Sequence, residues 1–232
     1  MVAVCPTRPA YPVRVTTVLL IRHGRSHANA QGLLAGRTET ALDDTGRTQA
    51  EQLAQRLSDV PFDLVVSSPQ LRARQTAEIV VAGRAEARID DAFAECDYGD
   101  WSGSALSELA TEPTWEIVQW LPSAAEFPDG ETMAQMTHRA THGVRRLVKE
   151  NPDSIIWVVS HGDVIKAILA DALGMHLDHF QRIVVDTASV SIVHYTPKRP
   201  FVERINDTGG IRLARKAPES DGEAVVGGRT AQ

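Results

Sequence analysis

The sequence has few cysteines, few aromatic residues and no excess of positive charge. Its two cysteines, Cys5 and Cys96, argue against a disulfide-built scaffold and fit a reducing, cytoplasmic location. Lysine and arginine number 24 against 30 aspartates and glutamates, which gives a net charge of −6. Nucleic acid and anionic membranes both attract positive charge, so we expect no general surface for either partner.

No stretch is apolar for long enough to cross a membrane. The run Val18–Ile21 ends at Arg22 and His23, whereas a spanning helix needs about 20 apolar residues. The first residues contain prolines and arginines but no apolar signal-peptide core. We expect residues 1–13 to form a flexible extension. We expect residues 214–232, rich in glycine, glutamate and small polar residues, to form a disordered tail.

What the sequence does contain fits a globular protein, with 43% hydrophobic and 23% charged residues. Apolar runs at 15–21, 64–66 and 155–159 predict buried strands. Helical periodicity lies between them, and alternating residues at 189–195 and 201–206 predict a hairpin at the sheet edge. Strands that alternate with helices predict an α/β fold, a three-layer α/β/α sandwich around a mainly parallel sheet.

We expect one domain over residues 14–213, and local signals in the sequence indicate where its helices begin. Asp44 or Thr45 is the expected cap of a first amphipathic helix. Ser68 is the expected cap of the next helix, with Pro69 at its first position. We also expect a long helix over 131–150 and an insertion of weak helical pieces over 104–130.

Polar residues follow directly after three predicted strands. They are Arg22-His23-Gly24, Ser67-Ser68-Pro69 and Ser160-His161-Gly162, with Arg72 one turn into the helix after the second strand. Ligands of parallel sheets bind at the carboxyl ends of the strands. If the three strands are neighbours, two histidines and two arginines converge there, and paired Arg donors suit a doubly charged tetrahedral anion. Two helix N-termini add N–H donors. The sequence therefore predicts a phosphate pocket, with the insertion above it.

A histidine among arginines favours nucleophilic attack on phosphorus, because nearby positive charge keeps the imidazole neutral. The leaving oxygen then needs a proton. Glu95 is the candidate general acid, since apolar neighbours can raise its pKa. Asp91, Asp97 and Asp100 lie close in sequence and remain alternatives on the residues alone.

Five motifs in this order resemble those of the histidine phosphatase superfamily, the phosphoglycerate-mutase-like group (branch 1). The resemblance spans about residues 15–206. The matching segments are Leu20-Ile21-Arg22-His23-Gly24, Ser67-Ser68-Pro69 with Arg72 and Thr76, Glu95 to Gly103, Pro128-Asp129-Gly130-Glu131-Thr132, and Val158-Val159-Ser160-His161-Gly162.

The resemblance implies a role for each residue that matches a motif. His23 is expected to be the nucleophile that forms a phosphohistidine. Arg22, Arg72 and His161 are expected to bind the phosphoryl oxygens and stabilise the transition state. Glu95 is expected to protonate the leaving group and then activate water. The family uses no metal, so no cofactor is expected.

Further residues are expected around the phosphate. The resemblance makes Asn29 a secondary phosphate contact, and Gly162 belongs to the predicted binding set through its motif. Arg25 stands where many family members have Glu, and it adds positive charge near the pocket. Arg37 is expected near the same opening, whereas Asp129 only replaces a common glycine.

Three other histidines have spacings that resemble metal sites. They are His27, four residues after His23, and the pair His138 and His142 on one helix face. We interpret them as non-ligands because the sequence positions no third ligand beside either pair.

The expected function is a metal-independent phosphomonoesterase acting on a small phosphorylated metabolite. A phosphoglycerate mutase is the first alternative, but only 66 positions (from 95 to 161) separate Glu95 from His161, which is short for that branch. A non-catalytic module that binds phosphorylated ligands is the second alternative. The substrate and the oligomeric state are not readable, although a homodimer is possible.

Overall fold

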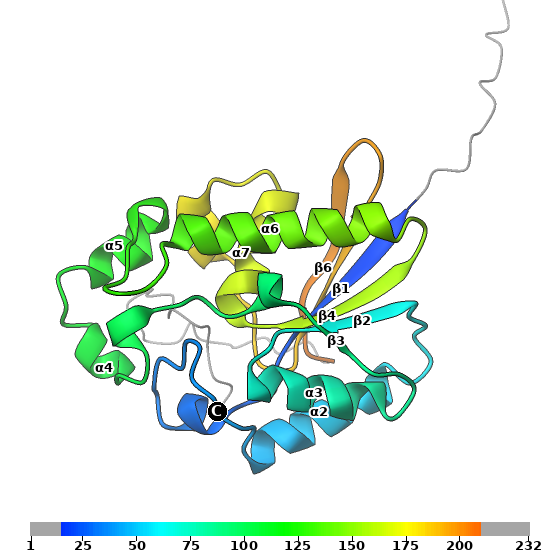
Figure 1. Ribbon diagram of the computed structural model, residues 1–232, viewed down its shortest axis with the longest axis horizontal. Helices are drawn as coiled ribbons and strands as arrows, with labels where there is room; N and C mark the ends of the chain where they lie inside the picture. Colours follow the sequence, from blue (N-terminus) through cyan, green and yellow to red (C-terminus); the bar gives the residue numbers. More distant parts are fainter. Residues whose placement is uncertain (1–14, 210–232) are drawn as a thin grey trace, which may run out of the picture.

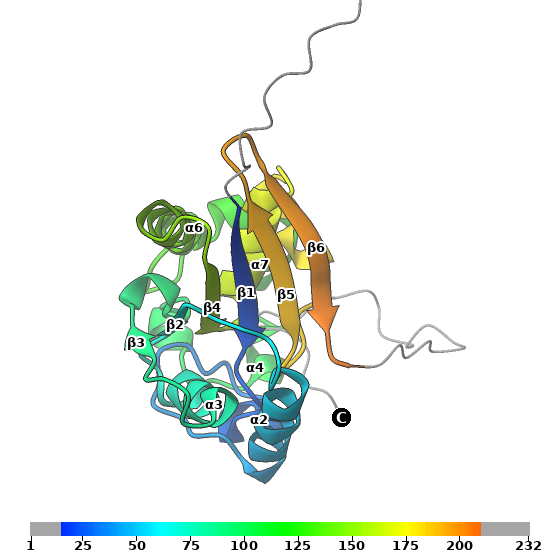
Figure 2. The same ribbon diagram turned by 90° about the vertical axis from the view of Figure 1, so that its right-hand side faces the viewer.

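A six-stranded sheet forms the centre of the computed structural model, which describes residues 15–209. The predicted extension 1–13 and tail 214–232 lie outside the described residues. The strand order is β3-β2-β4-β1-β5-β6, as Figure 2 shows. The strands are β1 (Thr16–Arg22), β2 (Leu64–Ser67), β3 (Arg88–Ile89), β4 (Ile155–Ser160), β5 (Val190–Tyr195) and β6 (Pro200–Asp207).

The pairing of the strands brings the predicted polar ends to one edge. β1 and β2 both pair in parallel with β4, so the three strands are neighbours. Arg22 lies beside Ser160, and Ser67 lies beside Val159. β5 runs antiparallel to β1, and β6 runs antiparallel to β5, so the last two strands form the predicted edge hairpin. The mainly parallel sheet is confirmed.

Helices cover both faces of the sheet, as Figure 1 shows, and this confirms the three-layer architecture. The helices on one face are α2 (Asp44–Arg56) and α3 (Leu71–Val81), and those on the other are α6 (Met133–Glu150) and α7 (Gly162–Ala172). Alternate strand residues enter two separate cores. Val18 and Leu20 join the core under α6 and α7, whereas Leu19 and Ile21 join the core under α2 and α3.

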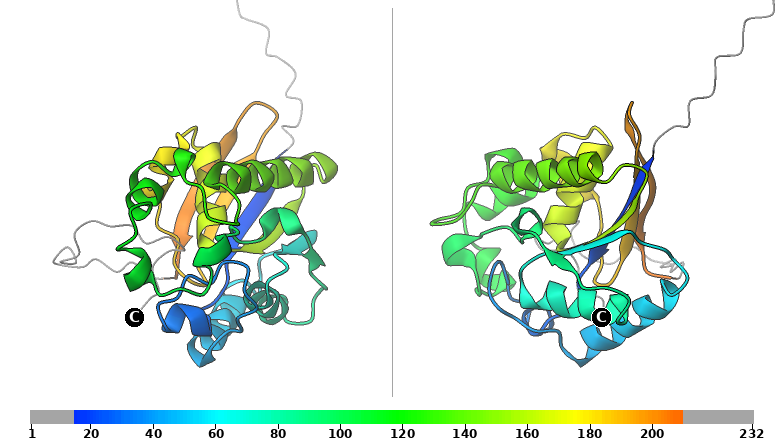
Figure 3. Two further views of the ribbon diagram at one scale, coloured as in Figure 1. Left: turned by 60° about the vertical axis from the view of Figure 1, so that its left-hand side comes forward. Right: turned by 45° about the vertical axis from the view of Figure 1, so that its right-hand side comes forward.

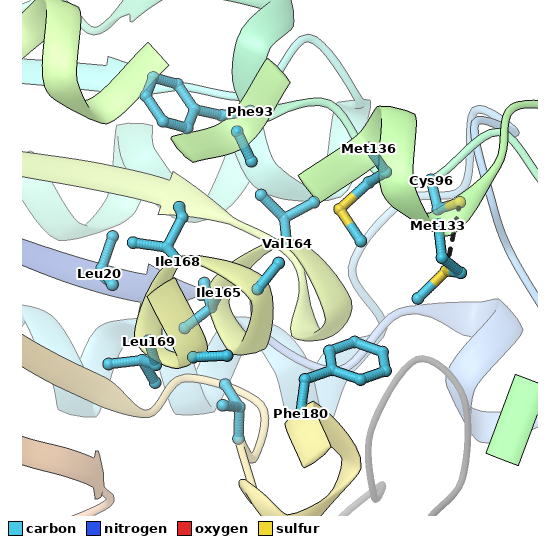
Figure 4. Close-up of a cluster of buried hydrophobic side chains, with 14 of the residues drawn as sticks. Leu20, Phe93, Cys96, Met133, Met136, Val164, Ile165, Ile168, Leu169 and Phe180 are labelled. Atoms are coloured by element: carbon cyan, nitrogen blue, oxygen red, sulfur yellow. Dashed lines mark hydrogen bonds between the residues drawn. The ribbon is translucent and has the colours of Figure 1, made fainter. Parts of the chain in front are cut away.

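The larger core is built around α7, a helix that is buried along nearly its whole length. Figure 4 shows Val164, Ile165 and Ile168 of α7 gathered with Leu20 of β1 and with Phe180. Phe180 belongs to the short helix η4 (Leu177–Arg182). Burial of this kind stabilises each large side chain by about 1.5–3 kcal/mol, and it fixes the helix that begins directly after His161.

Two predicted helix starts are wrong. α2 is capped by Asp43, not Asp44 or Thr45, because the Asp43 carboxylate accepts the Gly46 N–H at 2.7 Å. α3 begins at Leu71 with Gln70 at the cap position, so Ser68 is not its cap. The hydroxyl of Ser68 is used for a tertiary hydrogen bond, which outweighs the local capping preference.

The predicted insertion contains α4 (Leu106–Leu109), α5 (Trp115–Trp120) and the short helix η3 (Pro122–Ala124). Its start is joined to the segment after β1, since Gly103 N–H donates to the Leu34 carbonyl at 2.7 Å. Figure 3 (left) shows α4 beside this segment, which includes α1 (His27–Ala30). Aromatic packing holds the insertion to the main core, with Trp101 at 6.2 Å from Trp115 between ring centroids.

Two short 3-10 helices precede the insertion. η1 (Asp91–Phe93) and η2 (Gly99–Trp101) lie in the segment that carries Glu95. Among residues 15–209, no helix has the length and apolar character needed to span a bilayer.

Candidate active site

Three neighbouring strands deliver the predicted polar residues to one place. Arg22 ends β1 and His23 follows it, Ser68 follows β2, and His161 follows β4. Arg72 comes from the first turn of α3. All five residues are at most 2% exposed. A buried cluster of two arginines and two histidines is costly unless it binds an anion or is internally hydrogen bonded.

His23 is held as a neutral imidazole with an available lone pair. Its Nδ1 lies 2.7 Å from the Gly24 carbonyl, which can only accept, so Nδ1 carries the proton. Arg72 Nε donates to His23 Nε2 at 3.2 Å, so the lone pair is on Nε2. Burial, followed by the charges of Arg72 and Arg22, holds the pKa of His23 well below its ordinary value. His23 is therefore neutral at neutral pH, with its proton on Nδ1 and its lone pair on Nε2.

The two arginines are fixed by backbone carbonyls. Arg72 donates to Gly36 O at 2.7 Å and to Thr38 O at 3.1 Å, and Arg22 donates to Val185 O at 2.7 Å. Burial lowers the pKa of Arg72 to about 10 and also lowers that of Arg22. An Arg72 pKa of about 10 leaves its guanidinium charged at neutral pH, next to His23.

His161 lies beside His23 on the neighbouring strand. The ring centroids are 5.0 Å apart in an edge-on arrangement. His161 Nε2 lies 2.6 Å from Ser68 Oγ, and Nδ1 lies 3.8 Å from Oε2 of Glu95. Burial, then the charge of Arg72, lowers the pKa of His161 well below its ordinary value. The site therefore holds two neutral histidines, and an entering phosphate dianion would raise both pKa values.

Glu95 is the acidic side chain in contact with this cluster. It is 4% exposed, and its Oε1 accepts the Cys96 N–H at 3.0 Å. Burial, then the negative charge of Asp163, raises its pKa to about 7, although Arg72 and Arg22 act in the opposite direction. Of the alternative acids, Asp91 and Asp100 are exposed and Asp97 is ion-paired with Arg37. This geometry favours Glu95 as the proton donor.

The backbone of Glu95 is held by two arginines, of which only Arg37 was expected from the sequence. Arg139 donates to the Glu95 carbonyl at 2.9 Å, and Arg37 donates to it at 3.2 Å. Glu131 accepts from both arginines and from the Asp97 N–H. Glu131 lies in a motif that the sequence analysis quoted without a role, whereas no local signal distinguishes Arg139.

A second buried network lies under the site. Tyr98 donates to Asp163 at 2.7 Å, and Lys166 lies 3.5 Å from the same carboxylate while donating to Gln181 at 2.9 Å. All four are nearly inaccessible, and Asp163 raises the pKa of Glu95. Asp163 directly follows His161-Gly162, and its charge at the start of a mostly apolar helix was a signal that could have marked it.

The other residues predicted to contact the phosphate are Gly162, Asn29, Arg25 and Arg37. Gly162 is the first residue of α7, directly after His161. The Asn29 carbonyl oxygen accepts from Ser26 N–H and Oγ, so only its amide nitrogen could serve a ligand. The Arg25 guanidinium bonds to Asp43 and Thr45 at the start of α2, and the structure does not bring it to the cluster. Arg37 adjoins the Glu95 backbone, as described above.

The described residues contain no group of three or more His, Cys, Asp or Glu side chains suited to hold a metal ion. His138 and His142 are exposed and stack at 6.0 Å between ring centroids. His27 is exposed and four residues from the buried His23.

A fold with these two histidines at neighbouring strand ends defines a known class of protein. The family model of the histidine phosphatase superfamily (branch 1) matches residues 18–208, and the chain belongs to this family. The prediction of an enzyme of this superfamily, a phosphatase, is confirmed by the relatives that follow.

Two curated relatives and one solved structure are similar to the chain. Phosphoserine phosphatase 1 of Hydrogenobacter thermophilus is 31% identical over 194 residues, covering 82% of this chain and 92% of the relative. An acid phosphatase of Mycobacterium tuberculosis is 33% identical, covering 78% and 87%. A mutant phosphoserine phosphatase of Entamoeba histolytica, solved with phosphoserine, is 27% identical with a TM-score of 0.75, covering 84% and 98%.

Proposed function

We propose that the chain is a metal-independent phosphomonoesterase that acts through a phosphohistidine on His23. The observation that carries the proposal is the state of His23, whose Nε2 lone pair is available and whose pKa is held low between two arginines. Glu95, with a pKa of about 7, supports it as a neighbouring proton donor.

In the first step, His23 Nε2 attacks phosphorus and the bond from phosphorus to the ester oxygen breaks. Glu95 gives its proton to that oxygen, so the alcohol leaves neutral. Arg22 and Arg72 stabilise the charge on the three other phosphoryl oxygens. His161, protonated on Nδ1 when the dianion is bound, donates to the same oxygens.

In the second step, the Glu95 carboxylate takes a proton from water while the water oxygen attacks phosphorus. The bond from phosphorus to Nε2 breaks and returns its electron pair to His23, and inorganic phosphate forms. The acid of the first step is thus restored, as a two-step transfer through one carboxyl group requires.

The substrate is proposed to be a small phosphate ester of a metabolite. The similar proteins include phosphoserine phosphatases, one of them solved with phosphoserine, and an acid phosphatase. Two buried arginines beside the histidines support this proposal, because guanidinium groups pair well with phosphate oxygens. The single described cysteine, Cys96, is free and buried, which supports a cytoplasmic location.

The test is hydrolysis of an aryl phosphate in EDTA from pH 5 to 8, with His23→Ala beside the wild type. We expect turnover in EDTA that the variant loses. The control is interconversion of 3-phosphoglycerate and 2-phosphoglycerate, which we expect to be negligible beside hydrolysis. Activity that EDTA abolishes contradicts the mechanism, and efficient isomerisation favours a mutase.

A further inference from the structure

Gln70 is a buried polar residue that the proposed reaction does not use directly. It occupies the cap position of α3 with extended backbone (φ −64°, ψ 140°), yet its side chain makes no capping hydrogen bond. The residue is 5% exposed. A buried amide is costly unless it is hydrogen bonded, so its partners indicate what it does.

The partners of Gln70 establish which end of its amide faces the site. The Glu95 N–H, which can only donate, points to Gln70 Oε1 at 3.1 Å. The carbonyl oxygen therefore lies there, and the amide nitrogen lies on the other side. Ser68 Oγ is 2.6 Å from the same oxygen, so the hydroxyl donates its one proton to Gln70.

The hydrogen bond of Ser68 to Gln70 determines which ring nitrogen of His161 carries a proton. With its proton used, Ser68 Oγ can only accept from His161 Nε2, 2.6 Å away. Neutral His161 therefore carries its proton on Nε2 and its lone pair on Nδ1. Nδ1 lies 3.8 Å from Oε2 of Glu95 and has no hydrogen-bond partner among the described residues. Protonation of the ring then occurs at Nδ1, the atom that faces the proton donor.

We propose that Gln70 is a positioning residue whose carbonyl oxygen fixes the tautomer of His161 through Ser68 and anchors the backbone of Glu95. The role rests on the proposed function, because it concerns the same phosphoryl transfer. Without this oxygen, the Ser68 hydroxyl is free to donate to His161 Nε2, which favours the opposite tautomer. That tautomer places a proton on Nδ1 before substrate binds, and the Glu95 N–H loses its partner.

The kinetic test compares Gln70→Leu with Gln70→Glu. Leucine removes the acceptor, and we expect kcat to fall about tenfold to a hundredfold, the range seen when the support of a functional histidine is lost, with KM within about threefold. Glutamate keeps both accepted bonds, and we expect it to restore most of kcat. Its added negative charge beside Glu95 raises the pKa of that acid, so the alkaline limb of the kcat/KM profile moves to higher pH.

The matched control is Gln75→Leu in the same helix. Gln75 is a half-buried glutamine whose Oε1 also accepts a backbone N–H, that of Leu42 at 2.9 Å. It has no contact with His161 or Glu95 among its recorded bonds. We expect this variant to lose a similar bond and a similar amount of thermal stability, while kcat and the pH profile stay as in the wild type.

The tautomer is measured directly by two-bond ¹H–¹⁵N spectra of protein labelled at histidine, with His161→Gln to assign the signal. We expect a proton on Nε2 of His161 in the wild type and in Gln70→Glu. We expect a mixture of tautomers in Gln70→Leu. We expect the same mixture in Ser68→Ala, which replaces Gln70→Leu in this test if the leucine variant does not fold.

Three results overturn the proposal. They are a wild-type kcat and pH profile in Gln70→Leu, an equal loss of kcat in Gln75→Leu, and an unchanged tautomer in both Gln70→Leu and Ser68→Ala. The spectra are recorded without substrate, so they decide the role of Gln70 even if the wild type forms no phosphohistidine. In that case the proposed function fails separately.

Discussion

Glu95 remains a protonated acid near neutral pH because opposing influences act on one carboxyl group. Burial raises its pKa most strongly, and the charge of Asp163 raises it further. Arg72, the Cys96 N–H and Arg22 lower it, and the balance is a pKa of about 7. A pKa near the working pH suits a group that must give a proton in one step and take one in the next.

The pH profile is predicted from this acid and from the nucleophile. The proposed mechanism needs Glu95 protonated and His23 neutral. We therefore expect kcat/KM to fall as pH rises through about 7, and to fall on the acid side only well below pH 6.5. Glu95→Gln should remove the alkaline limb and reduce kcat by about 10²–10⁴-fold on alkyl phosphates, with a smaller loss on aryl phosphates. The measurement is kcat/KM against pH for both substrate types.

Asp100→Asn is the control for that profile, because Asp100 is an exposed carboxyl in the same segment. It should leave both limbs in place. An alkaline limb that persists in Glu95→Gln would contradict the assignment of Glu95.

The raised pKa of Glu95 also predicts how stability depends on pH. The folded protein holds this proton up to about pH 7, whereas an ordinary glutamate loses it near 4.5. The stabilising contribution is therefore fully present below about 4.5 and is lost as pH rises to about 7. The loss is on the order of 3 kcal/mol. Thermal unfolding from pH 4.5 to 8 should show the wild type losing stability relative to Glu95→Gln; parallel curves would contradict this.

At the scale of elements, the start of α2 packs directly against the segment that follows His23. A Cβ on Gly46 would lie 1.9 Å from the Arg25 carbonyl oxygen, and one on Gly24 would lie 2.4 Å from that of Gly46. Both neighbours are backbone atoms and cannot rotate away. Asp43 joins the same two segments by capping Gly46 and pairing with Arg25.

Gly46→Ala is therefore predicted to displace the segment after β1. We expect a destabilisation of about 1–3 kcal/mol, the usual cost of overpacking, and a fall in kcat because His23 moves with the backbone of Gly24. Thermal unfolding and kcat are the measurements. Thr48→Ala, on the exposed side of α2, should change neither the thermal stability nor kcat. A Gly46→Ala enzyme with wild-type kcat would show that the close contact of Gly46 with Gly24 and Arg25 is not critical.

The elements show what sequence could predict and what it could not. β1, β2 and β4 were predictable because their apolar runs are buried on both faces, and the polar residues at their ends then fell at one edge of the sheet. The cap of α3 was not predictable. Ser68 has the local signal of a cap, but its hydroxyl bonds to His161, which is 93 positions away in sequence.

The same reasoning applies to the buried polar side chains around the site. Arg139, Lys166 and Gln181 have no special local sequence context, and their partners are brought to them only by tertiary packing. Sequence spacing predicted the polar groups that the structure brings together at the strand ends. It could not identify the groups that hold them.

At the scale of the whole molecule, two buried arginines lie close together inside an acidic protein. The net charge is −6, yet Arg22 and Arg72 are both buried beside the two histidines. Two cores, one on each face of the sheet, hold these charges in place. An anion that enters the site relieves their repulsion, so ligand binding should stabilise the folded protein.

Inorganic phosphate is predicted to raise the Tm of the wild type. A concentration of about 100 times the Kd adds about 2.7 kcal/mol, which corresponds to a shift of about 5–10 °C for a chain of this size. Arg72→Ala should lose most of the shift, whereas Arg145→Ala, an exposed arginine on α6, should keep it. Equal shifts in the two variants would mean that phosphate binds elsewhere.

The phosphoenzyme is the most direct test of the account, because every step passes through His23 Nε2. The measurement is a rapid quench of enzyme and a phosphate ester labelled with ³²P, followed by peptide mapping. The account predicts an acid-labile, base-stable label on the peptide that contains His23, formed within one turnover and absent from His23→Ala. Label on another residue, or turnover by His23→Ala at the wild-type rate, would contradict it.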